Sequence, residues 1–370
     1  MEIFFSNSDF KIAGASFSGV PFFVNSEYRL LDEVNEFFTT NILIDGRINS
    51  KNTWKHYAYW LQDYIKWTLA NNIDWKTVTT LEVTAYRNWS LEECNLTPST
   101  VNSRISLIKR FYNYAIENDL AKSNPIQMLT SVYSKNVDSD MLNHTHRIKF
   151  QRNNLSIKTH QELPKIYSDD QVLELFKACE SERLKLMMRL MLECGMRRSE
   201  VCLLSLKLIE EIIKTAQILG SKSEIILKLP KEICKGNKSR QVIVSYTTVM
   251  RLMQYKATIR PKLVKKFKLV NNAHSESFWL TRQGSSYKSE SLSIEISKLG
   301  KKVGIDKATP HMFRHTFATN LYASTGNIRL VQKLLGHSHI QTTTIYEHSG
   351  ATDRKGFLAD YQNQLNELLN

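Results

Sequence analysis

The chain has 370 residues, 42% of them apolar, which is enough for two domains with separate cores. Fifty Lys and Arg oppose 36 Asp and Glu, and the net charge of +14 favours a polyanionic partner, nucleic acid before a membrane surface. A membrane-spanning apolar run, a signal-peptide pattern and a phosphate-binding glycine loop are all missing, which argues against a membrane protein, a secreted protein and an ATPase.

Helical periodicity dominates residues 27–128, which follow a short N-terminal extension, 1–26. We expect helices within 26–42, 52–72, 80–94 and 96–120. The second carries an apolar stripe of Trp54, Tyr57, Leu61, Tyr64 and Leu69. The fourth has Ser99 or Thr100 as its cap and turns inward Ile105, Ile108, Phe111, Tyr112 and Ala115. The basic side chains expected on the outer faces are candidate DNA contacts: Lys55, Arg104, Lys109 and Arg110.

The bundle ends at Asn124-Pro125, because a residue before proline resists the helical conformation. The following stretch loses periodicity and includes the basic sequence HTHRIKFQRNN. We predict an inter-domain linker over 129–164 that follows DNA phosphates. Its candidate contacts are Arg147, Lys149 and Arg152. A solvated loop without a partner is the alternative.

A second domain is predicted over 165–370, where Ser168 and Gln171 have the spacing of a capping box. Helices follow to about 208, then two strands, SEIILKL and RQVIVS, joined through the turn CKGNKS. Helices resume to the end of the chain. The expected fold is mainly α with a small antiparallel sheet. The last segment, RKGFLADYQNQLNELLN, offers Phe357, Leu358, Leu365 and Leu368 for packing on its own domain or on a neighbouring protomer.

Five cysteines are scattered along the chain, and no two have the C-x-x-C spacing of a redox or zinc motif. They are Cys94, Cys179, Cys194, Cys202 and Cys234. Free thiols in a reducing compartment fit this pattern, so we expect a cytoplasmic protein without disulfides, metal or another cofactor.

The segment TPHMFRHTFAT (309–319) gathers basic side chains at a predicted helix start. Thr309 is placed to cap the helix, and Pro310 takes a position where no N–H is needed. His311, Arg314 and His315 then share one face, near a helix N-terminus that favours anions. Taken alone, the segment is compatible with two interpretations: an anion-binding face, or a buried, hydrogen-bonded His315 beside a solvated Arg314.

Three further motifs fall in the same domain. ECGMRRSEVCLL ends one helix at Gly195 and begins the next with Arg197 and Glu200. KGNKSR places Lys235 and Lys238 at the tip of the strand pair, and Lys238 and Arg240 are further candidate DNA contacts. LLGHSHIQTTTIYEH contains His337 and, nine residues later (346 − 337 = 9), Tyr346.

Together these motifs, in this order and at this spacing, resemble the tyrosine recombinase or phage integrase family. The resemblance implies a helical core-binding domain at 27–128 and a catalytic domain at 165–370 that close a C-shaped clamp on duplex DNA. It implies a site-specific recombinase that works as a homotetramer on paired sites, without ATP or metal. Matched position by position, the implied catalytic residues are Arg197, Lys235, His311, Arg314, His337 and the nucleophile Tyr346.

The residue types suit that chemistry. Attack by a tyrosine on a phosphodiester gives a 3′-phosphotyrosine that keeps the bond energy, so rejoining needs no ATP. Two fork-shaped guanidiniums suit the charge on the non-bridging oxygens, and His337 donates a further hydrogen bond. A free tyrosine has a pKa of about 10, so Tyr346 needs a nearby acceptor such as His311. Lys235 is the best donor for the leaving 5′-oxygen.

Several of these residues have plainer readings. Glu200 is expected to brace Arg197, Arg198 to be solvated, and His315 to be a hydrogen-bonded core histidine, while His339 and His348 belong to the surface. At the level of function, two alternatives to the recombinase stay open: a type IB topoisomerase and a catalytically silent DNA-binding accessory protein. Among recombinases, the chain length favours a mobile-element integrase over a chromosome-dimer resolvase.

Overall fold

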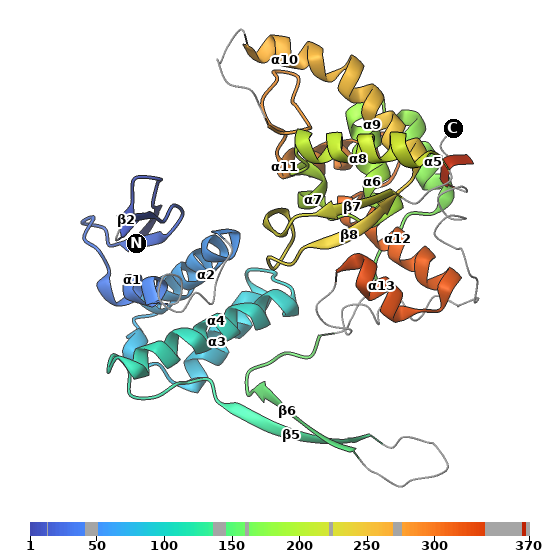
Figure 1. Ribbon diagram of the computed structural model, residues 1–370. Coiled ribbons are helices and arrows are strands. Elements are labelled where there is room, and N and C mark those ends of the chain that lie inside the picture. Colours follow the sequence, from blue (N-terminus) through green and yellow to red (C-terminus); the bar gives the residue numbers. More distant parts are fainter. Residues whose placement is uncertain are drawn as a thin grey trace. The chain divides into compact units, whose positions relative to one another are not determined.

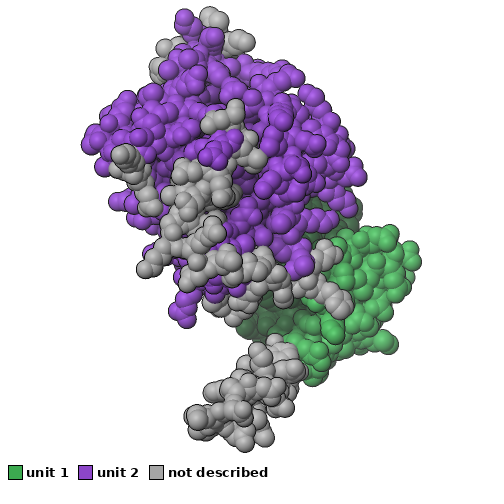
Figure 2. Space-filling view, turned by 90° about the vertical axis from the view of Figure 1, so that its right-hand side faces the viewer, with its two compact units in different colours: residues 1–161 green, residues 162–370 purple. Residues whose placement is uncertain are grey.

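The computed structural model describes residues 1–12, 14–40, 51–135, 146–159, 163–221, 225–268, 276–336 and 365–367. The chain divides into two compact units, Met1–Gln161 and Glu162–Asn370, which Figure 2 colours green and purple. Each unit has its own hydrophobic core. None of the described helices is both long enough and apolar enough to cross a membrane.

Unit 1 contains the predicted helices (Figure 1). They are α1 (Asp32–Thr39), α2 (Lys51–Ala70), α3 (Thr80–Glu92) and α4 (Pro98–Glu117). The cap of α4 is Thr97, which precedes the two predicted candidates and accepts a hydrogen bond from the Thr100 N–H. All five residues of α4 predicted to face inward are buried. In α2, Trp54, Leu61 and Tyr64 of the predicted stripe are buried, whereas Tyr57 is only partly buried and Leu69 is 61% exposed.

The prediction that Arg104 faces outward is wrong. Its side chain lies on the buried face of α4, between Val101 and Ile108, and only 9% of the residue is exposed. The guanidinium donates hydrogen bonds to the hydroxyl of Tyr86 (3.2 Å) and to the carboxylate of Asp63 (3.0 Å). A buried arginine needs such partners, so Arg104 joins α4 to α2 and α3 and does not face DNA.

The residues set apart as an N-terminal extension pack into the core of unit 1. Two antiparallel strand pairs form there: β1 (Glu2–Phe5) with β4 (Pro21–Val24), and β2 (Lys11–Ile12) with β3 (Ala15–Ser16). Val20 and Phe23 are fully buried in the same core as the helices. The buried Asn35 of α1 accepts from the Phe23 N–H (2.7 Å) and donates to the Phe23 carbonyl (3.0 Å), which fastens β4 to the first helix.

The predicted linker is not a loop throughout. Met128–Lys135 (β5) and His146–Asn153 (β6) form a long antiparallel pair whose register runs from Met128 opposite Asn153 to Lys135 opposite His146. The DNA-contact candidates Arg147, Lys149 and Arg152 all belong to β6, and the side chain of Arg152 is exposed. The alternative of a loop without regular structure is therefore wrong for these two strands, which cross-strand hydrogen bonds hold together.

Unit 2 is mainly helical with one small antiparallel sheet, which confirms the predicted fold class (Figure 1). The sheet pairs β7 (Ile225–Leu229) with β8 (Arg240–Val244) in the predicted positions. The helices are α5 (Asp169–Ala178), α6 (Glu182–Cys194), α7 (Arg198–Cys202), α8 (Leu206–Leu219), α9 (Tyr246–Thr258), α10 (Arg260–Lys268), α11 (Ser289–Lys302), α12 (Pro310–Thr325) and α13 (Ile328–Leu335). The capping box of Ser168 and Gln171 opens α5 as predicted.

Helix α6 is the central element of unit 2. Its residues from 186 onward are all buried, and it packs against α7, α9, α12 and β8. The five cysteines are free thiols. Three of them are buried in the core of unit 2: Cys194 at the end of α6, Cys202 at the end of α7 and Cys234 between β7 and β8. Near the C-terminus, Leu365 is buried in the same core and Asn366 accepts a hydrogen bond from Arg189 of α6. This end of the chain thus packs on its own unit; Phe357, Leu358 and Leu368 lie outside the described residues.

Replacing Asn35 by alanine tests the attachment of the N-terminal strands. The buried Phe23 N–H loses its acceptor, which costs about 1–3 kcal/mol. Hydrogen exchange of amides 1–24 should therefore speed up by about 5- to 150-fold, while α4 stays protected. Asn7→Ala is the matched control, since Asn7 is exposed and bonds only to nearby Asp9. Equal exchange in the two variants would show that the strands are held by other contacts.

Candidate active site

The site begins where α6 ends. Gly195 closes the helix in the left-handed conformation (φ 59°), as the sequence predicts. A Cβ at this position would lie 2.4 Å from the ring of Phe317 and 3.0 Å from Leu335, so glycine is required by both backbone and packing. The Gly195 carbonyl, left without a helical partner, accepts hydrogen bonds from Arg314 and from Arg240 (3.3 Å).

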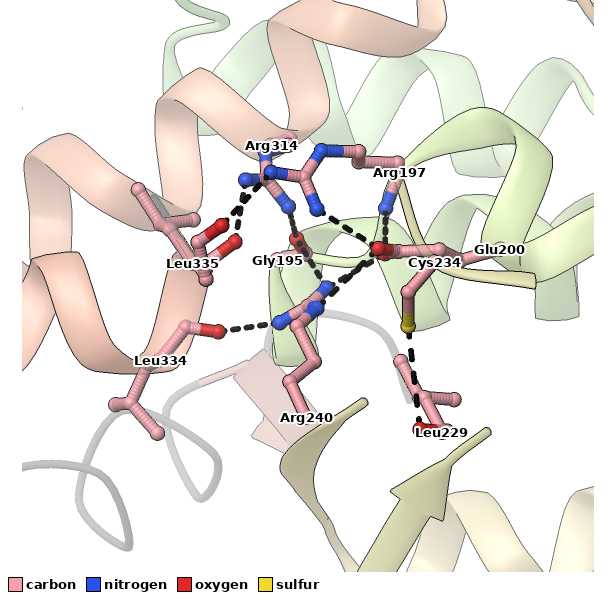
Figure 3. Close-up of polar contacts among 10 residues, drawn as sticks. Gly195, Arg197, Glu200, Leu229, Cys234, Arg240, Arg314, Leu334 and Leu335 are labelled. Atoms are coloured by element: carbon pink, nitrogen blue, oxygen red, sulfur yellow. Dashed lines mark hydrogen bonds and ion pairs between the residues drawn. The ribbon is translucent and has the colours of Figure 1, made fainter. Parts of the chain in front are cut away.

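Arg197 and Glu200 form a compact pair at the start of α7 (Figure 3). Arg197 is the N-cap residue, and Glu200 lies three residues later. One carboxylate oxygen accepts from the Arg197 guanidinium (2.8 Å) and the other from the Arg197 backbone N–H (2.7 Å). The predicted contact between the two side chains is present. Arg198 points elsewhere and donates to the Ser293 hydroxyl (2.6 Å).

Arg240 is the second partner of the Glu200 carboxylate. It donates from Nη2 (2.6 Å) and from Nε (3.3 Å). Glu200 is completely buried. Burial alone would raise the pKa of its carboxyl, but the hydrogen bonds and charges of Arg240 and Arg197 outweigh burial and lower the pKa to about 2. Glu200 is therefore a fixed negative charge between two arginines.

Helix α12 supplies the buried Arg314. Pro310 is its first residue and Thr309 its N-cap, as predicted, but the Thr309 hydroxyl makes no capping bond. The Tyr167 hydroxyl instead bonds the backbone of Thr309, accepting from its N–H (3.0 Å) and donating to its carbonyl (3.1 Å). Arg314 is only 3% exposed, so the reading of a solvated Arg314 is wrong. It donates to the carbonyls of Gly195 and, at 2.7 Å, Leu335.

Three arginines meet at the C-terminal end of α13. Its last turn leaves carbonyls without intrahelical partners, and the helix dipole makes that end negative. Arg240 donates to the carbonyl of Leu334, Arg314 to that of Leu335, and Arg197 to that of Gly336 (3.2 Å) (Figure 3). Gly336 ends the helix in the left-handed conformation (φ 64°). Leu335 and Gly336 are the first two residues of the L-G-H motif, so these bonds fix the main chain directly before His337.

The turn between β7 and β8 presents the two lysines of the K-G-N-K motif to solvent. Lys235 and Lys238 are both exposed. Gly236 takes a positive φ of 77°, and the Asn237 N–H bonds the Cys234 carbonyl (3.3 Å), as a turn with glycine at its third position requires. The prediction that Arg240 contacts DNA is wrong, because its side chain turns inward and all three of its guanidinium nitrogens donate to protein oxygens.

His311 lies within the field of these cations. Partial loss of hydration, followed by the positive charges of Arg314, Arg197, Arg198 and Lys235, lowers the pKa of His311 below its usual value. The ring is therefore neutral at pH 7 and has a lone pair for a proton. His315 is partly buried, not fully in the core, and its ring centre lies 5.5 Å from that of His311. Desolvation, His311 and Arg314 lower the pKa of His315 to about 4.

The structure thus brings together Arg197, Arg314, Glu200, His311 and Lys235. His337 and Tyr346, together with His339 and His348, lie outside the described residues. The sequence did not lead us to expect that Arg240 faces inward and bonds Glu200, or that the Tyr167 hydroxyl bonds the backbone of Thr309. For Arg240 a signal existed: it opens a strand whose next-but-one residues, Val242 and Val244, are buried, and the period of two places it on the same face.

Gly195→Ala should destabilise unit 2 by about 2–4 kcal/mol, the sum of left-handed strain and overpacking. Gly304→Ala is the matched control: it has the same sign of φ (76°), but no atom lies within 4 Å of the added Cβ. That variant should lose only the strain, about 1–2 kcal/mol. Calorimetry of the full chain measures both. If the Gly195 variant were no less stable than the Gly304 variant, the side chains of Phe317 and Leu335 would be able to shift and accommodate the added Cβ without a measurable cost in stability.

Two family models match the chain. The model "Phage integrase family" matches residues 165–352, and "Phage integrase, N-terminal SAM-like domain" matches residues 34–122. Among curated proteins, Tyrosine recombinase XerD of Rickettsia bellii (strain RML369-C) is 28% identical over 321 residues, covering 83% of this chain and 91% of the relative. The XerD of Proteus mirabilis is 28% identical over 330 residues, with coverage of 87% and 90%.

Solved structures share the fold. XerH site-specific recombinase bound to palindromic difH substrate, a post-cleavage complex, superposes with a TM-score of 0.55 at 16% identity, covering 91% of this chain and 86% of that one. A lambda integrase (75-356) dimer bound to a COC' core site gives 0.54 at 14% identity, with coverage of 88% and 97%. Because the integrase model spans about half of the chain and contains every residue gathered at the end of α6, this chain is a member of the phage integrase family.

Proposed function

We propose that this chain is a tyrosine-type site-specific recombinase that cleaves and rejoins duplex DNA through a 3′-phosphotyrosine. The observation that carries the proposal is the pairing of Arg197 and Arg314 on adjacent carbonyls at the end of α13. Two guanidiniums from different helices are thereby aimed at one place, close to a neutral His311 and the exposed Lys235. Such a cluster is suited to a single phosphodiester.

The reaction divides among these residues as follows. Arg197 and Arg314 bind the non-bridging oxygens and stabilise the charge that grows on them in the transition state. Neutral His311 accepts the proton of Tyr346 as its oxygen attacks phosphorus, and His337 donates a further hydrogen bond. The bond from phosphorus to the 5′-oxygen breaks, and Lys235 protonates that oxygen. Attack by another 5′-hydroxyl on the phosphotyrosine reverses the steps and reseals the strand.

Duplex DNA is the proposed partner, bound in the cytoplasm by a homotetramer on paired sites and so associated with the nucleoid. The net charge of +14 favours it, as do the solved structures of XerH bound to a difH substrate and of lambda integrase bound to a COC' core site. In unit 1 the candidate contacts that remain on the surface of the helices are Lys55, Lys109 and Arg110. The strand β6 adds Arg147, Lys149 and Arg152, and the β7–β8 turn adds Lys238.

Tyr346→Phe tests the nucleophile. Phenylalanine lacks the attacking oxygen, so covalent protein–DNA adducts should disappear while the Kd for duplex stays within about twofold, since surface phosphate contacts dominate binding. The substrate is a nicked suicide duplex carrying the sequence that the protein selects from randomised DNA. Tyr322→Phe in α12 is the matched control and should keep the adduct. An adduct in the Tyr346 variant would assign the nucleophile to another residue.

Replacement of Lys235 and Lys238 separates proton donation from phosphate contact. Lys235→Ala should slow cleavage by about 10²–10⁴-fold on normal DNA. A bridging 5′-sulfur is a better leaving group that needs little protonation, so it should restore most of that rate. Lys238→Ala should be mildly impaired on both substrates, through binding alone. If the sulfur substrate rescued Lys238→Ala and not Lys235→Ala, the general acid would be Lys238.

A further inference from the structure

Arg240 shares an acceptor with each of the two proposed catalytic arginines. With Arg197 it shares the carboxylate of Glu200, and with Arg314 it shares the carbonyl of Gly195. Its remaining bond goes to the Leu334 carbonyl, beside the carbonyl that holds Arg314. Figure 3 shows the guanidinium of Arg240 enclosed among these groups. One side chain thus joins β8, the end of α6, the start of α7 and the end of α13.

The stem of Arg240 also packs tightly. A Cβ built on Gly336 would lie 2.7 Å from Cδ of Arg240, so the main chain that precedes His337 rests directly on this side chain. Only 6% of the Arg240 side chain is exposed, and its Nε, Nη1 and Nη2 all donate to protein oxygens. Its charge is balanced inside the protein, by Glu200 and by the negative end of α13.

We propose that Arg240 is a positioning residue for strand cleavage: it holds Glu200, the Gly195 carbonyl and the end of α13 in one arrangement, and thereby sets the spacing of Arg197 and Arg314. The inference rests on the proposed recombinase function. A guanidinium suits this role because its planar fork holds donors on three separate nitrogens, whereas all donors of an ammonium lie on one nitrogen. Misplacement of catalytic groups by about 1 Å costs on the order of 10²-fold in rate.

The first test compares Arg240→Gln with Arg183→Gln. Arg183 is a matched control at the opposite end of α6: it is also mostly buried, donates to a glutamate, Glu295 (2.9 Å), and to a backbone carbonyl, Leu280 (2.8 Å). Both variants lose a buried arginine and should melt at lower temperatures. Only Arg240→Gln should lower the single-turnover rate of adduct formation, by about 10²-fold, with Kd for the duplex changed less than about threefold.

The second test uses pH, which a loss of folding stability alone would not reproduce. The groups that face Glu200 are Arg197 from α7, Arg240 from β8 and Cys234 from the turn. In the wild type the carboxyl stays ionised at any working pH. Without Arg240 one of its two cations is gone while burial remains, so its pKa rises and it takes up a proton as pH falls. The cleavage rate of Arg240→Gln, divided by that of the wild type, should therefore fall as the pH is lowered.

Two further variants complete the design. Arg240→Lys keeps the charge, so its rate ratio should stay flat with pH although its rate remains low. Adding Glu200→Gln to Arg240→Gln should slow cleavage little further, because the two residues act as one unit. Equal falls in rate and affinity would make Arg240 a DNA contact, and equal rates for the Arg240 and Arg183 variants would leave it a stability residue; either result overturns the inference. A wild type that forms no adduct would instead refute the proposed function.

Discussion

The unpaired carbonyls at the end of α13 are the constraint on which the candidate site depends. Three arginines from β8, α7 and α12 each donate to one of three consecutive carbonyls, from Leu334 to Gly336. Guanidiniums this close repel one another, and the negative helix end together with the buried carboxylate of Glu200 offsets that repulsion. The same bonds fix the directions of Arg197 and Arg314. A phosphate arriving there meets cations that are already oriented, so little reorganisation opposes its binding.

Local signals were predictable from the sequence because neighbouring residues satisfy them. The capping box that opens α5, the glycine that ends α6 and the proline that begins α12 each depend on a few consecutive residues, and all three are confirmed. The cap of α12 shows the limit of such reasoning. Thr309 stands where a capping hydroxyl is expected, but its side chain makes no capping bond. Its backbone N–H and carbonyl are bonded by the hydroxyl of Tyr167, 142 positions earlier. The residues around Thr309 do not predict a contact with Tyr167.

Buried arginines were the main error, for the same reason. Arg104 and Arg240 were placed on the surface because a lone cation is usually solvated, but each has acceptors brought to it by distant elements. The hairpin of β5 and β6 was missed although Ile148 and Phe150 alternate with basic residues, a period of two that favours a strand. In the candidate site, the residue types followed from the motifs. Their pairing through the end of α13 did not, since it joins residues up to 139 positions apart.

The anchoring of the chain near its C-terminus has a consequence for the proposed nucleophile. Gly336 is held by Arg197, and Asn366 by Arg189 in the middle of α6, so the chain is attached to unit 2 on both sides of residues 337–364. Tyr346 follows Gly336 by ten positions (346 − 336 = 10), which limits its reach to about 35 Å from that point. A reactive group tethered so shortly experiences the phosphate at a high effective concentration. Releasing Asn366 would remove one of these two attachments and lower the effective concentration of the proposed nucleophile at the proposed site.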